Sequence, residues 1–150
     1  MQQKRKIVPP VYLLASIGLI FVMNKWLPLG NAVPESWQWL SLVLMAFGLV
    51  MIFSSFGLFV KADTGVVPFD EATALVTSGF YRITRNPMYL GMVLILAAAA
   101  VKAGSIGAWL PIPLFIAVIH FNFILGEEEF LEEAFGSSYL AYKAKVRRWI

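Results

Sequence analysis

The side chains best suited to holding a charged ligand are concentrated between Thr77 and Gly91, in the sequence TSGFYRITRNPMYLG. Arg and Asn are costly to place in hydrocarbon, so we expect this segment at a boundary between water and membrane. Asn86 followed by Pro87 predicts a helix start, because Asn favours the N-cap and Pro the first helical position. Backbone donors and arginines at such a start could bind an anionic group of a ligand.

An acidic run from Glu127 to Glu133 forms a second candidate wall. At about 100° per residue, Glu129, Glu132 and Glu133 share one side of a helix. Glu127 lies in the middle of the apolar side, and Glu128 lies at its edge. A carboxylate in an apolar stripe must be paired or must serve a ligand. A structural ion pair with the arginines of segment 77–91 and a cofactor site are both open.

The composition indicates an integral membrane protein. The chain has 150 residues, of which 59% are hydrophobic and 14% charged, and its mean hydropathy is +0.74. Without cysteine it can form neither a disulfide framework nor a thiolate metal site, and a single histidine argues against a zinc site. No G-x-G sequence occurs, which excludes a Rossmann-type domain. We expect no nucleic-acid partner.

Apolar runs separated by turn residues predict an all-α membrane domain that occupies the whole chain, 1–150. We expect four transmembrane helices, at about 11–29, 37–60, 87–104 and 107–126. A charged cytoplasmic helix should follow at 127–145. The long polar connection between the second and third spans is expected to be functional, because long loops in compact proteins usually are.

The distribution of positive charge predicts the topology. The first ten residues, the 61–87 loop and the tail carry 3, 3 and 4 of the 12 Lys and Arg residues, whereas the two short loops on the opposite side hold only Lys25 and Lys102. The positive-inside rule therefore places both termini and segment 77–91 in the cytoplasm. Lys25 and Lys102 are expected to snorkel to the far interface.

Three sequence motifs occur in order along the second half of the chain. They are G-x-Y at Gly79 and Tyr81, R-N-P-x-Y-x-G from Arg85 to Gly91, and E-E-x-x-L-x-x-x-F-G-x-x-Y-x-x-Y from Glu127 to Tyr142, followed by a closing V-R-R-W. Together they resemble the isoprenylcysteine carboxyl methyltransferase and phospholipid methyltransferase superfamily. The chain looks like one of its short prokaryotic members, which implies a prokaryotic inner membrane.

This resemblance implies transfer of a methyl group from S-adenosyl-L-methionine to a lipophilic acceptor at the cytoplasmic membrane face, with S-adenosyl-L-homocysteine as product. It implies cofactor binding between the segment 77–91 and the helix of the double Glu. The implied cofactor-binding residues are Gly79, Tyr81, Arg85, Asn86, Pro87, Tyr89, Gly91, Glu127 and Glu128. As catalytic residues it points to Glu128 and to Arg148, or its neighbour Arg147, as the cation that orients an anionic acceptor.

Several alternatives stay open at this stage. Asn86 stands where carboxyl methyltransferases more often have His, so the acceptor could be a prenylcysteine carboxylate, a phospholipid amine, a small thiol or another lipid. His120 and Asn122 inside the fourth span are either functional or form interhelical hydrogen bonds. A small lipid-binding membrane module and an NADPH-dependent sterol-type reductase are the rival functions. Small residues in spans two and three would also suit a homodimer within the membrane lipids.

Overall fold

A computed structural model describes residues 8–65 and 72–150, and the all-α expectation is confirmed for this part of the chain. The helices, with short 3₁₀ turns and one π-turn labelled η, are α1 (Pro9–Trp26), η1 (Glu35–Trp37), α2 (Trp39–Lys61), η2 (Gly79–Arg82), α3 (Pro87–Ala103), η3 (Gly107–Trp109), α4 (Pro111–Ile119), η4 (His120–Ile124), α5 (Leu125–Phe135) and α6 (Ser137–Lys145).

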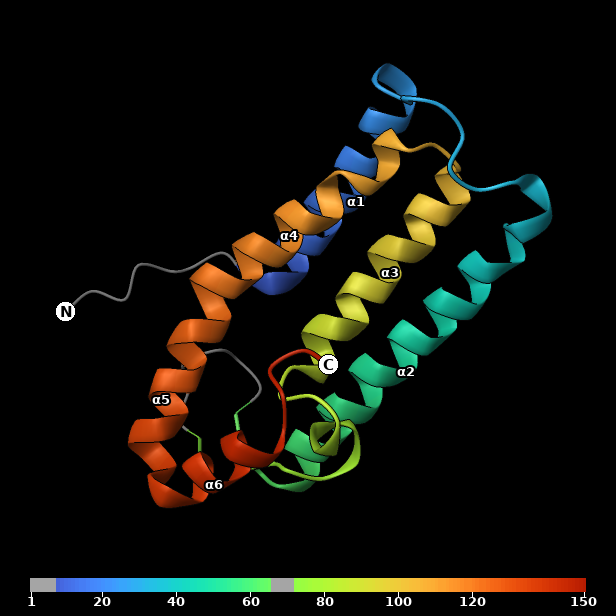
Figure 1. The fold of residues 1–150 in the computed structure, drawn as a ribbon. Helices are drawn as coiled ribbons and strands as arrows, with labels where there is room; N and C mark the ends of the chain where they lie inside the picture. The colour runs from blue at the N-terminus through green and yellow to red at the C-terminus, as the bar shows by residue number, and fades with distance from the viewer. Residues whose placement is uncertain (1–7, 66–71) are drawn as a thin grey trace.

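Helix α3 is the centre of the bundle. It lies between α2 on one side and α1 with α4 on the other (Figure 1). Its residues Leu96 and Ala100 are fully buried, and they pack in one apolar core with Ile20 of α1 and Phe115 of α4. Since apolar burial is the main favourable contribution to folding, the other helices are organised around α3.

Helices α2 and α3 approach each other closely because glycines face each other at their contact. A Cβ atom added to Gly91 would lie 2.7 Å from the carbonyl oxygen of Gly48 and 2.8 Å from Cγ1 of Ile52. Small residues allow helix backbones to approach in this way. The small-residue faces that suggested a homodimer are thus used within the chain; a homodimer stays a prediction, without this support.

The loops separate into two ends of the bundle. At one end the 27–38 and 104–110 connections are joined by backbone hydrogen bonds, from Ala32 N–H to the Gly104 carbonyl (2.8 Å) and from Ile106 N–H to the Gly30 carbonyl (2.9 Å). At the other end lie the start of α1, the segment before α3, α6 and the C-terminus. The start of α1 and the C-terminus thus lie at the same end of the bundle, and the side of the membrane that this end faces stays a prediction.

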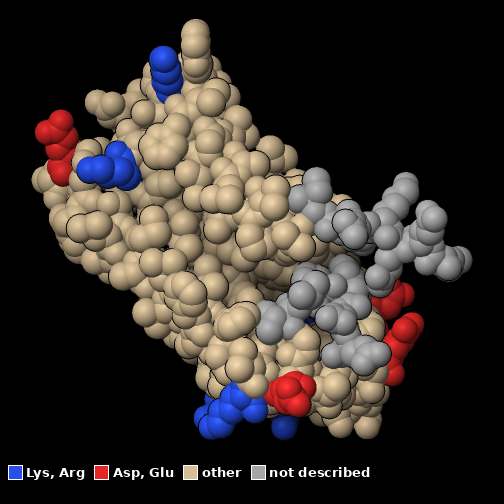
Figure 2. All heavy atoms as spheres, turned by 180° about the vertical axis from the view of Figure 1, so that it is seen from behind, with Lys and Arg blue, Asp and Glu red and all other residues tan. Residues whose placement is uncertain are grey.

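Two helical stretches, Glu35–Lys61 and Gly107–Phe135, are long and apolar enough to cross a membrane, and α3 is a shorter apolar helix. Large apolar side chains of α2, such as Leu42 and Phe53, are exposed. On the face in Figure 2 the charged side chains gather towards the two ends and leave the middle uncharged. This pattern is typical of a protein surrounded by lipid.

The helix boundaries differ from the expected ones in two places. The expected helix 127–145 is divided into α5 and α6, because Gly136 adopts φ +50° and ψ −123°, a conformation that glycine reaches readily. The expected span 107–126 has no break at its end: its helix continues through η4 into α5 as far as Phe135. Along this helix the residues change from apolar to charged while the backbone stays helical. The change in residue type therefore indicates different surroundings and does not mark the end of the helix.

The α2–α3 contact predicts opposite effects for two glycine-to-alanine substitutions. Gly91→Ala should lower the free energy of unfolding by about 2 kcal/mol, because the new methyl group meets the backbone of Gly48. Gly57→Ala, within α2, has nothing within 4 Å of the added Cβ atom and should raise it by up to about 1 kcal/mol through helix propensity. Thermal unfolding in detergent, followed by circular dichroism, measures both. Equal effects would contradict the assigned contact.

Candidate functional site

The C-terminal segment is attached to the entrance of α3 by hydrogen bonds. Arg85 N–H donates to the Arg147 carbonyl (2.9 Å), while Thr84 Oγ1 (3.1 Å) and Asn86 Nδ2 (2.9 Å) both donate to the Arg148 carbonyl. A parallel bridge pairs Thr84 with Arg147. Residues 84–86 and 147–148 thus form one unit, although they lie at opposite ends of the second half of the chain.

Asn86 occupies the N-cap position of α3 and Pro87 its first turn, as expected, but the Asn86 side chain makes no capping hydrogen bond. The Asn86 carbonyl accepts the N–H of Leu90 (2.9 Å). The side-chain amide instead donates to the Arg148 carbonyl, because the C-terminal segment lies against it. The prediction of a side-chain cap is therefore wrong, and the Asn86 side chain binds the C-terminal segment instead.

Glu128 forms the ionic centre of the site. Its Oε1 accepts hydrogen bonds from Arg85 Nη2 (2.9 Å) and Arg148 Nε (2.8 Å), and its Oε2 accepts one from Arg148 Nη2 (2.8 Å). Its side chain is 8% exposed. Lys143 Nζ lies 3.8 Å from Oε2. The structural ion pair that the sequence left open is formed at Glu128.

Two tyrosines and an arginine around this centre keep fixed protonation states. Tyr142 Oη donates to the Tyr81 carbonyl (2.7 Å), and burial raises the pKa of Tyr142 to about 12. Burial likewise raises the pKa of Tyr81. The hydrogen bond to Glu128 raises the pKa of Arg148. At neutral pH both phenols are uncharged and the guanidinium is charged.

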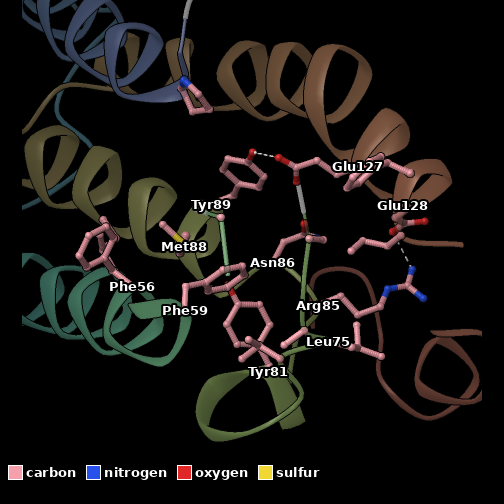
Figure 3. Close-up of a pocket in the computed structure, with 18 of the residues that line it drawn as sticks. Phe56, Phe59, Leu75, Tyr81, Arg85, Asn86, Met88, Tyr89, Glu127 and Glu128 are labelled. Carbon is pink, nitrogen blue, oxygen red and sulfur yellow. Dashed lines mark hydrogen bonds and ion pairs between the residues drawn. The ribbon is translucent and has the colours of Figure 1, made fainter. Parts of the chain in front are cut away.

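Glu127 faces a different partner. Tyr89 Oη donates a hydrogen bond to Glu127 Oε1 (2.7 Å), which links α3 to α5 (Figure 3). Within residues 8–65 and 72–150, Glu127 forms no ion pair. Neighbouring carboxylates therefore have different surroundings, since Glu128 contacts cations and Glu127 contacts a neutral hydroxyl group.

These groups surround a cavity of about 460 Å³ at the end of the bundle that holds the C-terminus. Its walls are mainly apolar and aromatic (Figure 3). They come from α1, α2, the segment before α3, α3 itself, α5 and α6; among the described residues the lining is Val8, Pro9, Pro10, Ile52, Phe56, Phe59, Gly65, Ala72, Ala74, Leu75, Val76, Tyr81, Arg85, Asn86, Met88, Tyr89, Met92, Glu127, Glu128, Phe130, Leu131, Tyr139 and Tyr142.

Most of the residues expected at a cofactor site meet in this cavity: Tyr81, Arg85, Asn86, Tyr89, Glu127 and Glu128. Three others do not line it. Gly91 faces Gly48, Gly79 adopts φ +59° beside Leu58, and Pro87 is buried in the first turn of α3. Arg148 does not line the cavity but contacts two residues that do, Glu128 through its guanidinium and Asn86 through its carbonyl.

Phe56, Phe59 and Met88 were not singled out from the sequence, although they line the cavity. They stand among many other apolar residues of the spans, so residue type alone carries no signal for them. Tyr139 and Tyr142, both from the motif that begins at Glu127, also line the cavity. Burial of Tyr139 at 1% exposure and the hydrogen bond of Tyr142 place both in the wall.

A π-turn, His120–Ile124, lies between α4 and α5. Phe123 and Ile124 at its end are both buried, as are Phe115 and Ile119 before it. A π-turn changes the phase of the residues that follow it, because it bonds each residue to the fifth one along. Glu128 follows Ile124 by four residues and lies on the same buried face, where it contacts the arginines.

His120 and Asn122 lie in this turn and do not line the cavity. Asn122 is exposed, and its Nδ2 donates to the Val118 carbonyl of the same helix (2.9 Å). The His120 ring packs edge-on against Phe121, with 5.0 Å between the ring centroids. The interhelical hydrogen bond that we considered for Asn122 is therefore replaced by a bond within its own helix.

The described residues form an all-α protein with two helical stretches apolar enough to cross a membrane and a cavity at one end. The model of the phospholipid methyltransferase family matches residues 37–138, and the chain belongs to this family, which groups with the isoprenylcysteine carboxyl methyltransferase type. The family match includes Arg85, Tyr89, Glu127 and Glu128 of the cavity lining, and leaves out the lining residues of α1 and α6 and Arg148. The resemblance seen in the motifs is thus confirmed.

A protein from Haemophilus influenzae is similar to part of the chain. It is 48% identical over 63 residues, which is 42% of this chain and 100% of that protein, and it is described as an uncharacterized protein. No solved structure matches the chain.

The Glu128 centre predicts a loss of stability on Glu128→Gln. Removing the charge leaves Arg85 and Arg148 facing a neutral amide, and Arg85 is buried, so the free energy of unfolding should fall by about 3 kcal/mol. The matched control is Glu132→Gln, whose partner Lys143 is half-exposed and whose effect should be small. Unfolding of both variants by titration with a denaturing detergent provides the comparison; equal losses would refute the central role of Glu128.

Proposed function

We propose that this protein is a membrane-embedded methyltransferase that uses S-adenosyl-L-methionine and acts on a lipophilic acceptor at the cytoplasmic face. The proposal depends on one observation: Glu127 and Arg85, opposite in charge, line the same apolar cavity in a member of the phospholipid methyltransferase family. The supporting arguments are the chemistry of this lining, its size and the charge distribution along the chain.

The lining fits such a cofactor chemically. The amino-acid part of S-adenosyl-L-methionine has an ammonium group, for which Glu127 is a suitable partner, and a carboxylate, which needs donors. The Nε atom of Arg85 is buried and has no hydrogen-bond partner among the described residues. A buried donor without a partner is costly, and a ligand carboxylate would remove that cost. Phe56, Phe59 and Tyr81 provide apolar surface for an adenine ring.

The size of the cavity agrees with this assignment. A volume of about 460 Å³ falls within the range of roughly 300–1,000 Å³ that is usual for sites that bind small molecules. Apolar walls with a few polar groups are also usual for such sites.

The cofactor would supply an electrophilic methyl group, and the chain would supply position and exclusion of water. Methyl transfer is an in-line displacement, so most of the acceleration comes from orientation of the two reactants in a dry site. In our proposal, Glu127 and Arg85 orient the amino-acid part, and the Tyr89 hydroxyl holds the Glu127 carboxylate in place. The apolar residues of α2 and α5 exclude water from the reacting groups.

The resemblance assigned catalytic roles to Glu128 and Arg148, and the contacts favour a different role for both. Arg148 is bound to Glu128 by two hydrogen bonds, and its side chain is 34% exposed. We therefore propose that Arg148 and Glu128 are positioning residues that hold Arg85 and Asn86 in the cavity wall. The acceptor class, whether carboxylate, amine or thiol, stays open.

For the membrane arrangement we propose four spans with both termini in the cytoplasm of a prokaryotic cell. Two stretches are long enough by themselves, while α1 and α3 lie beside them in the same bundle. The Lys and Arg count supports the orientation, because the first ten residues, the 61–87 loop and the tail carry 3, 3 and 4 of the 12 along the sequence.

The proposal predicts that detergent-purified protein binds S-adenosyl-L-homocysteine saturably, in the micromolar range, by isothermal titration calorimetry. Glu127→Gln should weaken this binding by about tenfold or more, since it removes a charged partner of the ammonium group. Glu129→Gln is the matched control, because Glu129 is an exposed neighbour on the same helix and should bind as the wild type does. We choose Glu127 because Glu128 substitutions would also release the C-terminal segment.

Absence of binding by the folded wild-type protein with lipid present would overturn the methyltransferase assignment. Binding of NADPH instead would identify a relative of the reductases, and binding of neither nucleotide would favour a lipid-binding module. An unchanged affinity in Glu127→Gln would refute the role of Glu127.

A further inference from the structure

A second hollow lies at the opposite end of the bundle from the candidate site. It is a groove of about 490 Å³ with lining residues from α1, α2 and α3. The residues are Ile17, Phe21, Gln38, Trp39, Ser41, Leu42, Met45, Ala98, Ala99 and Lys102. None of them belongs to the first cavity, so the groove is a separate feature.

The groove exists because α1 and α2 both pack on α3 on either side of small residues. Ala98 and Ala99 of α3 form its floor, and the longer side chains of Phe21, Leu42 and Met45 form its walls. Leu42 is 74% exposed, so the groove is open along its length to the surroundings of the bundle. Acyl chains are as apolar as these side chains, so a hydrocarbon chain is chemically compatible with the groove.

One end of the groove is polar and positively charged. Lys102 Nζ donates a hydrogen bond to Gln38 Oε1 (3.3 Å), and Ser41 Oγ donates to the Gln38 carbonyl (2.7 Å). Among the described residues, Lys102 forms no ion pair with a carboxylate. We expected the Lys102 side chain to extend towards water at the far interface. Its amine is bound to Gln38 at the rim of the groove, which the exposed Trp39 also lines.

We propose that this groove binds an anionic phospholipid, with one acyl chain between α1 and α2 and the phosphate at Lys102. The apolar walls match the acyl chain, and the positive charge of Lys102, which has no carboxylate partner among the described residues, matches the headgroup. A lipid with net negative charge is favoured over a zwitterionic one, because the headgroup of the latter brings its own cation to Lys102. The proposal concerns a different surface from the candidate methyltransferase site and does not depend on that function.

Trp39 provides a spectroscopic probe of the groove. The protein is placed in phosphatidylcholine nanodiscs that contain increasing fractions of phosphatidylglycerol with brominated acyl chains, which quench tryptophan at short range. The signal of Trp39 is the difference between the wild type and Trp39→Phe, which removes the contributions of the other four tryptophans. We expect saturable quenching at low fractions of phosphatidylglycerol, and only gradual quenching by brominated phosphatidylcholine.

The charge variants decide whether Lys102 selects the lipid. For Lys102→Gln, the Trp39 signal is the difference between this variant and the double variant that also carries Trp39→Phe. Lys102→Gln should raise the half-saturating fraction of phosphatidylglycerol about fivefold. Lys25→Gln is the matched control, because Lys25 carries the same charge at the same end, lies 5.6 Å from the Trp26 ring centroid and does not line the groove. It should leave the fraction unchanged.

Three results would overturn the proposal: equal quenching by the two lipids, no effect of Lys102→Gln, or equal effects of the two lysine variants. The last would assign the preference to general surface charge. Circular dichroism melting confirms that each variant is folded. A failure here would leave binding of S-adenosyl-L-homocysteine unaffected, so the two proposals are tested separately.

Discussion

The interaction on which the rest of the structure depends is the buried contact of Glu128 with Arg85 and Arg148. Glu128 lies 43 residues after Arg85 and 20 residues before Arg148 in the chain. Its contacts therefore connect α5 with the entrance of α3 and with the C-terminus. A carboxylate at this depth is stable only with its cations in place. Its two oxygens accept three hydrogen bonds from the guanidinium groups, which leaves it little capacity to bind a ligand.

Two backbone features accompany this contact. The close approach of Gly48 and Gly91 brings α2 against α3, so that Phe56 and Phe59 can reach the cavity. The π-turn lies directly before α5, whose Glu128 contacts the arginines. π-Turns are frequent at functional sites, and this one immediately precedes the acidic wall.

The helices and the composition of the two cavity walls could be predicted from the sequence, because apolar runs, an Asn-Pro step and helical phase all depend on local residue types. The roles of Gly91 and Asn86 could not, because both depend on segments distant in the chain: the backbone of Gly48 and the carbonyl of Arg148. Every residue has a main-chain carbonyl, so a contact with one has no signature in the amino-acid sequence. The different partners of Glu127 and Glu128 could not be predicted either, because they come from α3 and from the C-terminal segment, which are distant in the chain.

The two neighbouring glutamates show how stability and ligand binding can be separated on one helix. They point about 100° apart, so they contact different surroundings. Glu128, paired with cations, contributes to holding the fold together. Glu127 is held by the hydroxyl of Tyr89 and, among the described residues, by no cation, so its charge is incompletely compensated beside an apolar cavity. A carboxylate without a cation partner beside an apolar cavity does not stabilise the fold. Carboxylates of this kind are concentrated at functional sites, where a ligand provides the missing positive charge. The imbalance at Glu127, together with the unpartnered Nε of Arg85 in the same wall, is therefore the strongest physical reason to expect a zwitterionic ligand in this cavity.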